Sequence, residues 1–224
     1  MNSAVIVAAG LGTRFGSARP KQFLEINGRP MIFYTLERFE RCAAVDEIIL
    51  VLSAGEIENF EKLAAGRSLK KLKKIVAGGR TRAESVFNGL QAVDEQSGTV
   101  AVHDGARPLV APEEIAAALE KANETGAACL VAKVTDTIKR VAGGRILETV
   151  DREHLRRALT PQCFKTELLR RAFENADLNE SVTDECFLVE KLGVPISFVE
   201  GSPLNIKITT PEDFTVAEML LKVD

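Results

Sequence analysis

Apolar runs alternate along this chain with longer amphipathic stretches. Residues 4–9 form a continuous apolar run that is rich in β-branched side chains and ends at a glycine. Such a run is typical of a strand buried on both faces of a parallel sheet. Comparable runs follow at 47–52, 74–77, 100–103, 128–132 and 196–199. Between them, apolar residues recur at helical spacing, as at Ile32, Leu36 and Phe39. This alternation predicts a doubly wound, mostly parallel α/β sheet.

The amphipathic stretches predict helices whose ends carry capping residues. In the clearest case, Pro112 occupies a favoured first-turn position, two glutamates follow it, and Gly126 ends the helix. Three more expectations concern helix ends. Thr183 caps a helix over 184–192, Thr210 caps the last helix with Pro211 as its first residue, and the helix before the third strand reaches about Leu72, which places Lys70, Lys71, Lys73 and Lys74 on a solvated helix end.

Residues 134–152 depart from this pattern. Two short β-type runs, 137–141 and 145–149, flank an Ala-Gly-Gly sequence, which predicts a hairpin with a glycine turn. Because an isolated hairpin is marginal in water, we expect it to pack on another surface, and a second copy of the chain is one candidate. The chain of 224 residues is therefore expected to form one domain over 1–224, with 134–152 as a protruding β-arm.

The loop after the first strand combines glycines with cations. Gly10 and Gly12 can bring backbone N–H groups close to phosphate oxygens, and Arg14 and Lys21 add full positive charge. The spacing of Gly10, Gly12 and Gly16 does not match a dinucleotide-binding turn, and the next strand does not end in an acidic residue. A P-loop sequence is also missing. The remaining interpretation is a loop that grips a nucleoside triphosphate.

Polar residues also follow the third and fourth strands. Gly78 and Gly79 open a helix that carries Ser85, and Asp104 follows the fourth strand. Ligands of doubly wound sheets bind beyond the carboxyl ends of the strands, so these residues should face one crevice. Asp104 is a hard oxygen ligand of the kind that Mg²⁺ takes beside phosphate oxygens, although it could also cap a helix or turn. His103 is expected to be a structural hydrogen-bonding residue.

Composition narrows the function classes. The net charge of −3, the lack of tryptophan and the single tyrosine disfavour a general nucleic-acid surface. No apolar run approaches the length of a membrane span, and no signal peptide is recognisable. The four cysteines form no C-x-x-C pair, which argues against a zinc site and a disulfide scaffold. We therefore expect a cytoplasmic protein with small buried cysteines.

An ordered series of motifs extends these observations along the whole chain. The series is Ala8-Ala9-Gly10-x-Gly12-x-Arg14, Pro20-Lys21-Gln22, Gly78-Gly79-x-x-Arg82-x-x-Ser85-Val86, His103-Asp104-x-Ala106-Arg107-Pro108, Asp136-Thr137-Ile138-Lys139, Thr149-Val150-Asp151-Arg152, Thr160-Pro161-Gln162, Thr183-Asp184-Glu185 and Asn205-Ile206-Lys207. It resembles the 2-C-methyl-D-erythritol 4-phosphate cytidylyltransferase family of the non-mevalonate isoprenoid pathway. The first motif alone fits many sugar-nucleotide transferases, whereas the full series is specific. Arg80 stands where an acidic residue can occur in the family.

The resemblance implies a Rossmann-like nucleotidyltransferase fold and a Mg²⁺-dependent reaction. A phosphate oxygen of the sugar alcohol would attack the α-phosphorus of CTP, with pyrophosphate as the leaving group. The β-arm would reach the partner's active site in a homodimer. The implied site residues are Arg14, Lys21 and Lys207 for catalysis, Ala8, Ala9, Gly10, Gly12, Gly79 and Ser85 for CTP, Arg107, Thr137, Arg152, Thr160 and Thr183 for the sugar phosphate, and Asp104 for Mg²⁺.

Two alternatives stay open at this point. Ribitol-5-phosphate cytidylyltransferase resembles the chain in the opening loop and in the Asp104 motif, although residues 8–10 and 149–152 favour the isoprenoid enzyme. A non-catalytic nucleotide-binding module belongs to a different class. Such a module would be expected to lack Arg14, Lys21 or Asp104, and all three are present.

Overall fold

A computed structural model describes residues 1–10, 20–176 and 182–222 of the protein. Its centre is a seven-stranded sheet with the order β11-β7-β10-β6-β1-β4-β5. The strands are β1 (Asn2–Ala8), β4 (Glu47–Leu52), β5 (Leu72–Ala77), β6 (Thr99–Asp104), β7 (Ala127–Lys133), β10 (Arg156–Lys165) and β11 (Ser197–Glu200). Their pairings are parallel, except that β10 runs antiparallel to β6 and β7. The doubly wound, mostly parallel sheet is therefore confirmed.

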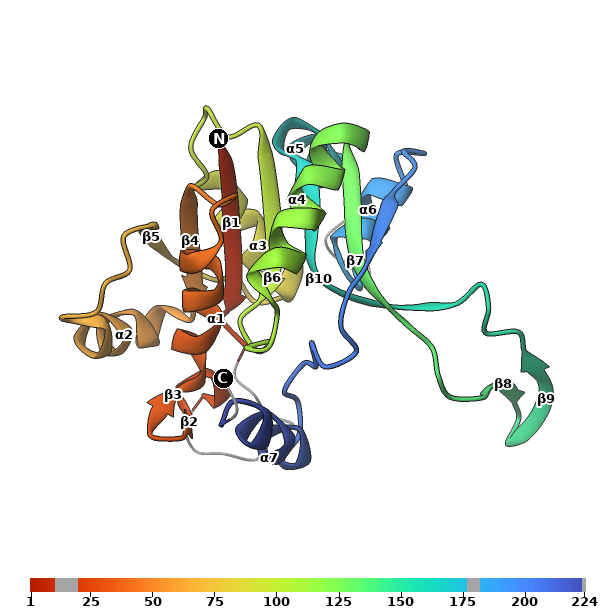
Figure 1. Ribbon diagram of the computed structural model, residues 1–224. Helices are drawn as coiled ribbons and strands as arrows, with labels where there is room; N and C mark the ends of the chain where they lie inside the picture. The colour runs from red at the N-terminus through yellow and green to blue at the C-terminus, as the bar shows by residue number, and fades with distance from the viewer. Residues whose placement is uncertain (11–19, 177–181, 223–224) are drawn as a thin grey trace.

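Helices cover both faces of this sheet (Figure 1). They are α1 (Met31–Arg41), α2 (Ile57–Ala64), α3 (Arg82–Gln91), α4 (Pro112–Thr125), α5 (Thr166–Glu174) and α6 (Glu185–Glu190). The last helix, α7 (Pro211–Leu220), instead packs in a separate small cluster with Ile26 and Met31. Alternate residues of β1 belong to different cores: Ala4 and Ile6 pack with α1, α2 and α4, whereas Val5 packs with α3, α5 and α6. Burial on both faces explains why the strand sequences are continuously apolar.

Helix α3 lies unusually close to the sheet. A Cβ atom placed on Gly89 would stand 2.4 Å from Val5 Cγ1 and 2.8 Å from Val51 Cγ2, both of which are closer than van der Waals contact allows. The missing side chain lets the helix rest directly on β1 and β4. This packing fixes the first turn of α3 beside the carboxyl end of β1, where the candidate site lies.

Strand β10 has no counterpart among the predicted strands. Its sequence places Thr160, Pro161 and Gln162 in its middle, so neither alternation nor a continuous apolar run identifies it. The register with β7 shifts between Ala158 and Gln162, which accommodates a proline that cannot donate a ladder hydrogen bond. Both polar side chains are buried and, as described below, belong to the network around Asp104.

Two predicted helices are confirmed together with the residues that were predicted to begin, cap or end them. Helix α4 begins at Pro112 and is followed by Gly126, and α7 begins at Pro211. Thr210 caps α7, because its side chain accepts a hydrogen bond from the Asp213 N–H group. The side chain of Asp213 accepts in return from the Thr210 N–H group, at 2.9 Å. This reciprocal capping box fixes the direction in which the chain enters its last helix.

The predicted end of the second helix is wrong. Helix α2 ends at Ala64 instead of near Leu72, because Gly66 turns the backbone with a φ of 81°. Lys73 and Lys74 therefore lie in β5, not on a helix end. Strand β5 is an edge strand, and charged side chains on an edge discourage pairing with other chains.

The cap of α6 is Asp184 and not Thr183. Asp184 Oδ1 accepts a hydrogen bond from the Phe187 N–H group at 3.0 Å, and Oδ2 accepts from Gln162 Nε2 at 2.8 Å. A carboxylate can bond the helix end and a neighbouring strand at once, whereas the single hydroxyl of Thr183 offers less. The N-terminus of α6 is thus fastened to β10.

A two-stranded hairpin lies within residues 134–152, where it was predicted. Strands β8 (Ile138–Ala142) and β9 (Arg145–Val150) pair antiparallel around Gly143 and Gly144, which have φ of 54° and 73°. The hairpin stands well away from the seven-stranded sheet (Figure 1). Val141, Ile146 and Leu147 on it are 60–66% exposed. Its role as a dimerisation arm stays a prediction.

All four cysteines are free and buried, as the sequence analysis expected. Within the described ranges, no helix combines the length and the apolar character that a membrane crossing requires. Outside the main sheet, the short elements are β2 (Glu25–Ile26), β3 (Arg29–Pro30) and the 3₁₀ helices η2 (Lys21–Phe23) and η3 (Ala54–Glu56).

Candidate active site

A pocket of about 790 Å³ opens at the carboxyl ends of β1, β4, β5 and β6. The predicted site residues that line it are Ala8, Ala9, Gly10, Lys21, Gly79, Ser85, Asp104 and Lys207. Gly12 and Arg14, which the sequence also placed here, lie outside the described residues. The pocket therefore brings five of the six residues predicted for CTP together with two of the three predicted catalytic cations.

The turn before α3 is built from backbone that comes very close to its neighbours. A Cβ atom on Gly78 would stand 2.4 Å from Ala9 Cβ, and one on Gly79 would stand 2.3 Å from Glu84 Cβ. Ser85 Oγ accepts a hydrogen bond from the Gly79 N–H group at 3.1 Å and donates to the Thr81 carbonyl at 2.9 Å. Only glycine fits these two positions, and Ser85 holds the turn in shape.

The charged side chains around the pocket are mostly basic. Lys21, Arg80, Arg82 and Lys207 line it, against two acidic residues, Glu84 and Asp104. Arg80 is largely exposed, and its Nη2 lies 3.1 Å from Glu84 Oε1. Hydrogen bonds from the backbone and side chain of Arg80 hold the pKa of Glu84 below its usual range. Such a surplus of cations suits a polyphosphate ligand.

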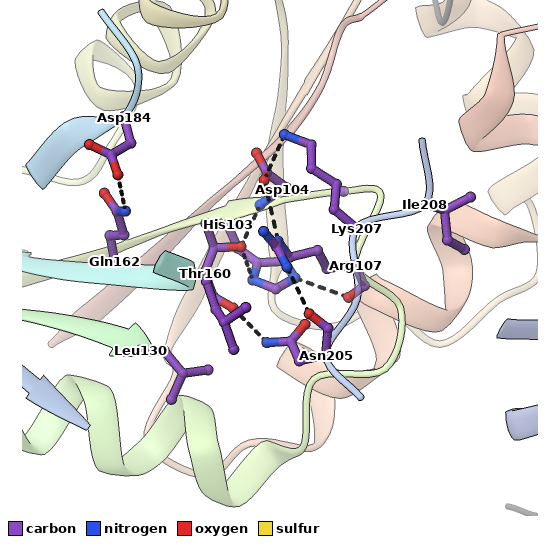
Figure 2. A network of polar contacts seen from close by, with 12 residues as sticks. His103, Asp104, Arg107, Leu130, Thr160, Gln162, Asp184, Asn205, Lys207 and Ile208 are labelled. Carbon is purple, nitrogen blue, oxygen red and sulfur yellow. Dashed lines mark hydrogen bonds and ion pairs between the residues drawn. The ribbon is translucent and has the colours of Figure 1, made fainter. Parts of the chain in front are cut away.

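Asp104 is the centre of the charged network (Figure 2). Its Oδ1 lies 3.1 Å from Arg82 Nε, and its Oδ2 lies 2.9 Å from Lys207 Nζ and 3.4 Å from Arg107 Nε. Burial alone would raise the pKa of this carboxyl group, but the charges of Arg82, Lys207 and Arg107 outweigh it and hold the pKa well below its usual range. Asp104 therefore stays ionised and fixes Lys207 beside the pocket.

His103 and Thr160 form a chain of hydrogen bonds that ends at the backbone of Asp104 (Figure 2). Thr160 Oγ1 accepts a hydrogen bond from the Asp104 N–H group at 3.1 Å and lies 3.0 Å from His103 Nδ1. His103 Nε2 lies 3.1 Å from the Arg107 carbonyl, so Nε2 must donate and Nδ1 must accept from Thr160. Burial lowers the pKa of His103 to about 4. The neutral ring is the structural hydrogen-bonding residue that the sequence predicted.

The segment 201–210 carries Lys207 across this network. Asn205 Nδ2 donates to the Thr160 carbonyl at 2.9 Å, and Arg107 Nη1 donates to the Asn205 carbonyl at 2.7 Å. The Ile208 N–H group donates to the Ala106 carbonyl at 2.8 Å. These bonds fasten an irregular segment to the end of β6, so that Lys207 is carried on a fixed backbone.

Lys21 reaches the same segment from the other side of the pocket. Its Nζ donates to the Ile208 carbonyl at 2.6 Å, and the neighbouring Gln22 is buried with its Nε2 2.7 Å from the Ala8 carbonyl. Gln22 thus ties η2 to the end of β1. Both lysines thus line the pocket, Lys21 bonded to the Ile208 carbonyl and Lys207 to the Asp104 carboxylate.

The residues predicted for the sugar phosphate are not gathered in the pocket of one chain. Arg107 and Thr160 lie behind Asp104, where they make the contacts described above. Thr183 is exposed just before α6, and Thr137 and Arg152 are exposed at the base of the hairpin. Arg152 Nη1 donates to the Thr135 carbonyl. A site made from all five residues would need a second chain or a movement of these segments.

Sequence reasoning gave no role to three residues of the network. Arg82, Gln162 and Glu185 each stand in a motif of the ordered series. Their roles become clear only from the residues that they contact in the folded chain. Arg82 Nη1 lies 2.6 Å from Glu185 Oε1, and Gln162 bonds the first turn of α6. The only sequence signal for these residues was a charged or amide side chain within a short motif. Spacing along the chain does not indicate which distant residues pair in the fold.

The carboxylates at the pocket decide whether it could hold Mg²⁺. In the described part of the chain, no cluster of three or more His, Cys, Asp or Glu side chains could hold a metal ion. Asp104 offers one carboxylate at the pocket, and Mg²⁺ bound with a nucleotide commonly takes one or two carboxylates with phosphate oxygens and water as its other ligands. The residues fit such an ion if Lys207 shares or leaves Oδ2.

Comparison with known proteins gives one consistent result. A family model described as "IspD: 2-C-methyl-D-erythritol 4-phosphate cytidylyltransferase" matches residues 2–223. A relative from Halalkalibacterium halodurans with that enzyme name is 45% identical over 220 residues, which cover 98% of this chain and 96% of the relative. One from Pelotomaculum thermopropionicum, with the same name, is 44% identical over 225 residues, which cover 98% and 94%.

Solved structures agree with the sequence matches. The crystal structure of 4-diphosphocytidyl-2C-methyl-D-erythritol synthase from Anaerococcus prevotii superposes with a TM-score of 0.88 at 30% identity, covering 99% of this chain and 96% of that one. The 2-C-methyl-D-erythritol 4-phosphate cytidylyltransferase from Thermus thermophilus gives 0.80 at 34% identity, covering 97% and 98%. The whole described fold is therefore shared with these proteins.

The lowered pKa of buried His103 should make the stability of the protein depend on pH. An unfolded histidine has a pKa of about 6.5, and burial lowers that of folded His103 to about 4. Between these values the unfolded chain binds a proton that the folded protein does not. The free energy of unfolding should therefore fall as the pH drops through this window, by up to about 3 kcal/mol from this group.

Urea denaturation at pH 7 and pH 4.5 measures this loss. The variant His103→Gln should show a smaller loss between the two pH values than the wild type, whatever its stability at pH 7. The exposed His154 provides the control, since His154→Gln should lose as much as the wild type. An equal loss in His103→Gln and the wild type would contradict the assignment.

Proposed function

The chain belongs to the 2-C-methyl-D-erythritol 4-phosphate cytidylyltransferase family, and from this premise we propose how its pocket works. The reaction is cytidylyl transfer from CTP to 2-C-methyl-D-erythritol 4-phosphate in isoprenoid precursor biosynthesis, which gives 4-diphosphocytidyl-2-C-methyl-D-erythritol and pyrophosphate. The observation that carries the proposal is the joining of a tight glycine turn, two lysines and an ionised aspartate in one pocket. The family match favours this reaction over ribitol-5-phosphate cytidylyl transfer and over a non-catalytic module.

CTP binds along the carboxyl ends of β1 and β5. Ala8, Ala9, Gly79 and Ser85 form the cytosine site, where small side chains, and none at Gly79, let the base approach the backbone closely. Gly10 and Gly12 offer N–H groups to the triphosphate. This arrangement reads the nucleotide mainly through backbone groups, which small residues leave accessible.

The transfer itself needs alignment and charge neutralisation. A phosphate oxygen of the sugar alcohol attacks the α-phosphorus and forms the new P–O bond, while the bond from the α-phosphorus to the oxygen that bridges it to the β-phosphorus breaks. That oxygen leaves with pyrophosphate. Lys21 and Lys207, with Arg14 from the opening loop, balance the charge that gathers on these oxygens. The ion pair with Asp104 holds the Lys207 ammonium group at the wall of the pocket.

A divalent cation completes this proposal. Bound beside Asp104, Mg²⁺ would supply further positive charge to the triphosphate oxygens. Asp104 can offer it one carboxylate at the wall of the pocket. The side chain is ionised over the whole physiological range, because its basic neighbours hold its pKa low.

The proposed sugar-phosphate residues support a homodimer. The hairpin carries exposed apolar side chains and stands away from its own sheet (Figure 1). Thr137 and Arg152, which flank its strands, do not line the pocket of their own chain. We place them in the partner's site, where they join Arg107, Thr160 and Thr183 of the partner chain. The chain is one nucleotidyltransferase domain with 134–152 as its arm. Free buried cysteines suit a reducing cytoplasm.

Pyrophosphate release tests the reaction. The purified protein with CTP and Mg²⁺ should release pyrophosphate when 2-C-methyl-D-erythritol 4-phosphate is added, and not with ribitol 5-phosphate, because the family match favours the first substrate. Release with ribitol 5-phosphate alone would move the assignment to the other cytidylyltransferase. Silence with both, together with a rise in melting temperature on adding CTP, would leave a nucleotide-binding module.

Removal of a lysine should affect the chemical step. Lys21→Ala and Lys207→Ala should fold normally and lose about 10³ to 10⁵ in kcat, or about 4–7 kcal/mol, because a cation of this kind acts on the charge of the transition state. Steady-state kinetics of pyrophosphate release measures the loss, with the exposed Lys222→Ala as a control. Near-normal turnover in either variant would remove that lysine from the catalytic set.

Arg152→Ala should raise KM for the sugar phosphate more than it lowers kcat, since its proposed task is binding. If the arm serves the partner, mixing and reassembling Arg152→Ala chains with Lys21→Ala chains should restore part of the activity, because mixed dimers contain one intact site. Steady-state kinetics and this complementation assay measure the two effects. Unchanged KM and kcat in Arg152→Ala, or no recovery on mixing, would exclude a site shared between subunits.

A further inference from the structure

Glu185 is a fully buried carboxylate that does not line the pocket. Its two oxygens face the guanidinium of Arg82, with Oε1 2.6 Å from Nη1 and Oε2 3.0 Å from Nη2. This is the bidentate geometry in which arginine and carboxylate groups pair most strongly. Burying a charge is costly, so a glutamate at this place calls for an explanation that substrate contact does not give.

Arg82 connects this buried carboxylate to the active site. Its third nitrogen, Nε, lies 3.1 Å from Asp104 Oδ1. One planar guanidinium therefore spans two carboxylates, and each holds a different edge of it. Since a lysine offers a point charge and not a fork, no other basic side chain could make both contacts in this way.

The base of Glu185 is itself immobilised. Gln162 Oε1 accepts hydrogen bonds from the N–H groups of Glu185 and Cys186, at 3.1 and 3.0 Å. Gln162 Nε2 donates to Asp184, the cap of α6. Three hydrogen bonds to the side chain of Gln162 thus fasten the first turn of α6 to β10, and Glu185 projects from this fixed turn.

The contacts close into a ring around Asp104. Strand β10 holds the backbone of Asp104 directly through Thr160, and it holds the carboxylate of Asp104 indirectly through Gln162, Glu185 and Arg82. Fixing both backbone and side chain determines where the carboxylate points. The carboxylate in turn fixes Lys207 Nζ at 2.9 Å.

We infer that Glu185 is a positioning residue, which acts through Arg82 to hold Asp104 and Lys207 in the geometry that cytidylyl transfer requires. The inference rests on the proposed function and adds to it a residue outside the pocket. It also gives Arg82 a task that differs from direct phosphate binding, although Arg82 lines the pocket. Loss of this support should misplace the reacting groups more than it weakens nucleotide binding.

A double-mutant cycle tests the inference on the full-length protein. Glu185→Gln and Arg82→Gln should each lower kcat by about 10- to 100-fold, the size expected from a misplacement of about 1 Å. The Kd for CTP, measured without Mg²⁺, should change by less than about threefold, which is well below the expected change in kcat. Because both residues act as one unit, the double variant should be no slower than Arg82→Gln alone. Glu190→Gln, an exposed carboxylate on the same helix, should behave like the wild type.

The outcomes separate the two proposals. A wild-type protein that releases no pyrophosphate overturns the proposed function and this inference with it. An active wild type with normal kcat in Glu185→Gln, or with multiplying losses in the double variant, overturns the inference alone. A large loss of CTP affinity in Arg82→Gln also overturns it, because Arg82 would then contact the nucleotide itself.

The single variant Glu185→Gln leaves Arg82 without its buried partner and could fail to fold. The double variant leaves no unpaired buried charge at this pair, so it remains measurable. If Glu185→Gln does not fold, the kcat of the double variant is compared with that of Arg82→Gln to test whether Glu185 acts through Arg82. Wild-type turnover in the double variant would overturn the inference, and a loss equal to that of Arg82→Gln would support it.

Discussion

A carboxylate that has lost its water can stay ionised only if cations and hydrogen-bond donors replace that water. Asp104 meets this condition at the end of β6, where two arginines and one lysine surround its oxygens. Each of these partners comes from a different part of the chain. The condition therefore determines more than one charge: it draws α3, the turn after β6 and the segment 201–210 to one point, and the pocket is the space that they leave.

The sheet explains why this point lies where it does. Strand β1 has β4 on one side and β6 on the other, and successive residues of β1 face opposite helical layers. The connections after β1, β4 and β6 lead to α1, α2 and α4 on one face, whereas the connection after β5 leads to α3 on the other face. The pocket opens where these connections begin, beyond the carboxyl ends of the strands. Gly89 brings α3 against β1 without a spacer, and Gly78 and Gly79 let the chain turn within that crevice. Close packing and ligand access are thus produced by the same residue type.

Sequence reasoning succeeded where the signal is local. Continuous apolar runs identified the parallel strands, Thr210-Pro211 identified the start of α7, and the glycines after β1 and β5 pointed to the pocket. It failed for β10, because the polar residues inside that strand answer to distant partners instead of to a periodic pattern. It also missed Glu185, whose ion-pair partner, Arg82, stands 103 positions earlier. Pairing at that range depends on topology, which spacing along the chain does not encode.

The contact between Lys21 and the Ile208 carbonyl spans 187 positions of the sequence. During synthesis, the glycine turn and the first lysine leave the ribosome long before the segment that carries Lys207. A growing chain can pair β1 with β4 and bury much of its core, yet it has no second lysine to face the first one. The charged pocket can therefore be completed only among the last events of synthesis, when the segment that bonds Lys21 and carries Lys207 has been made.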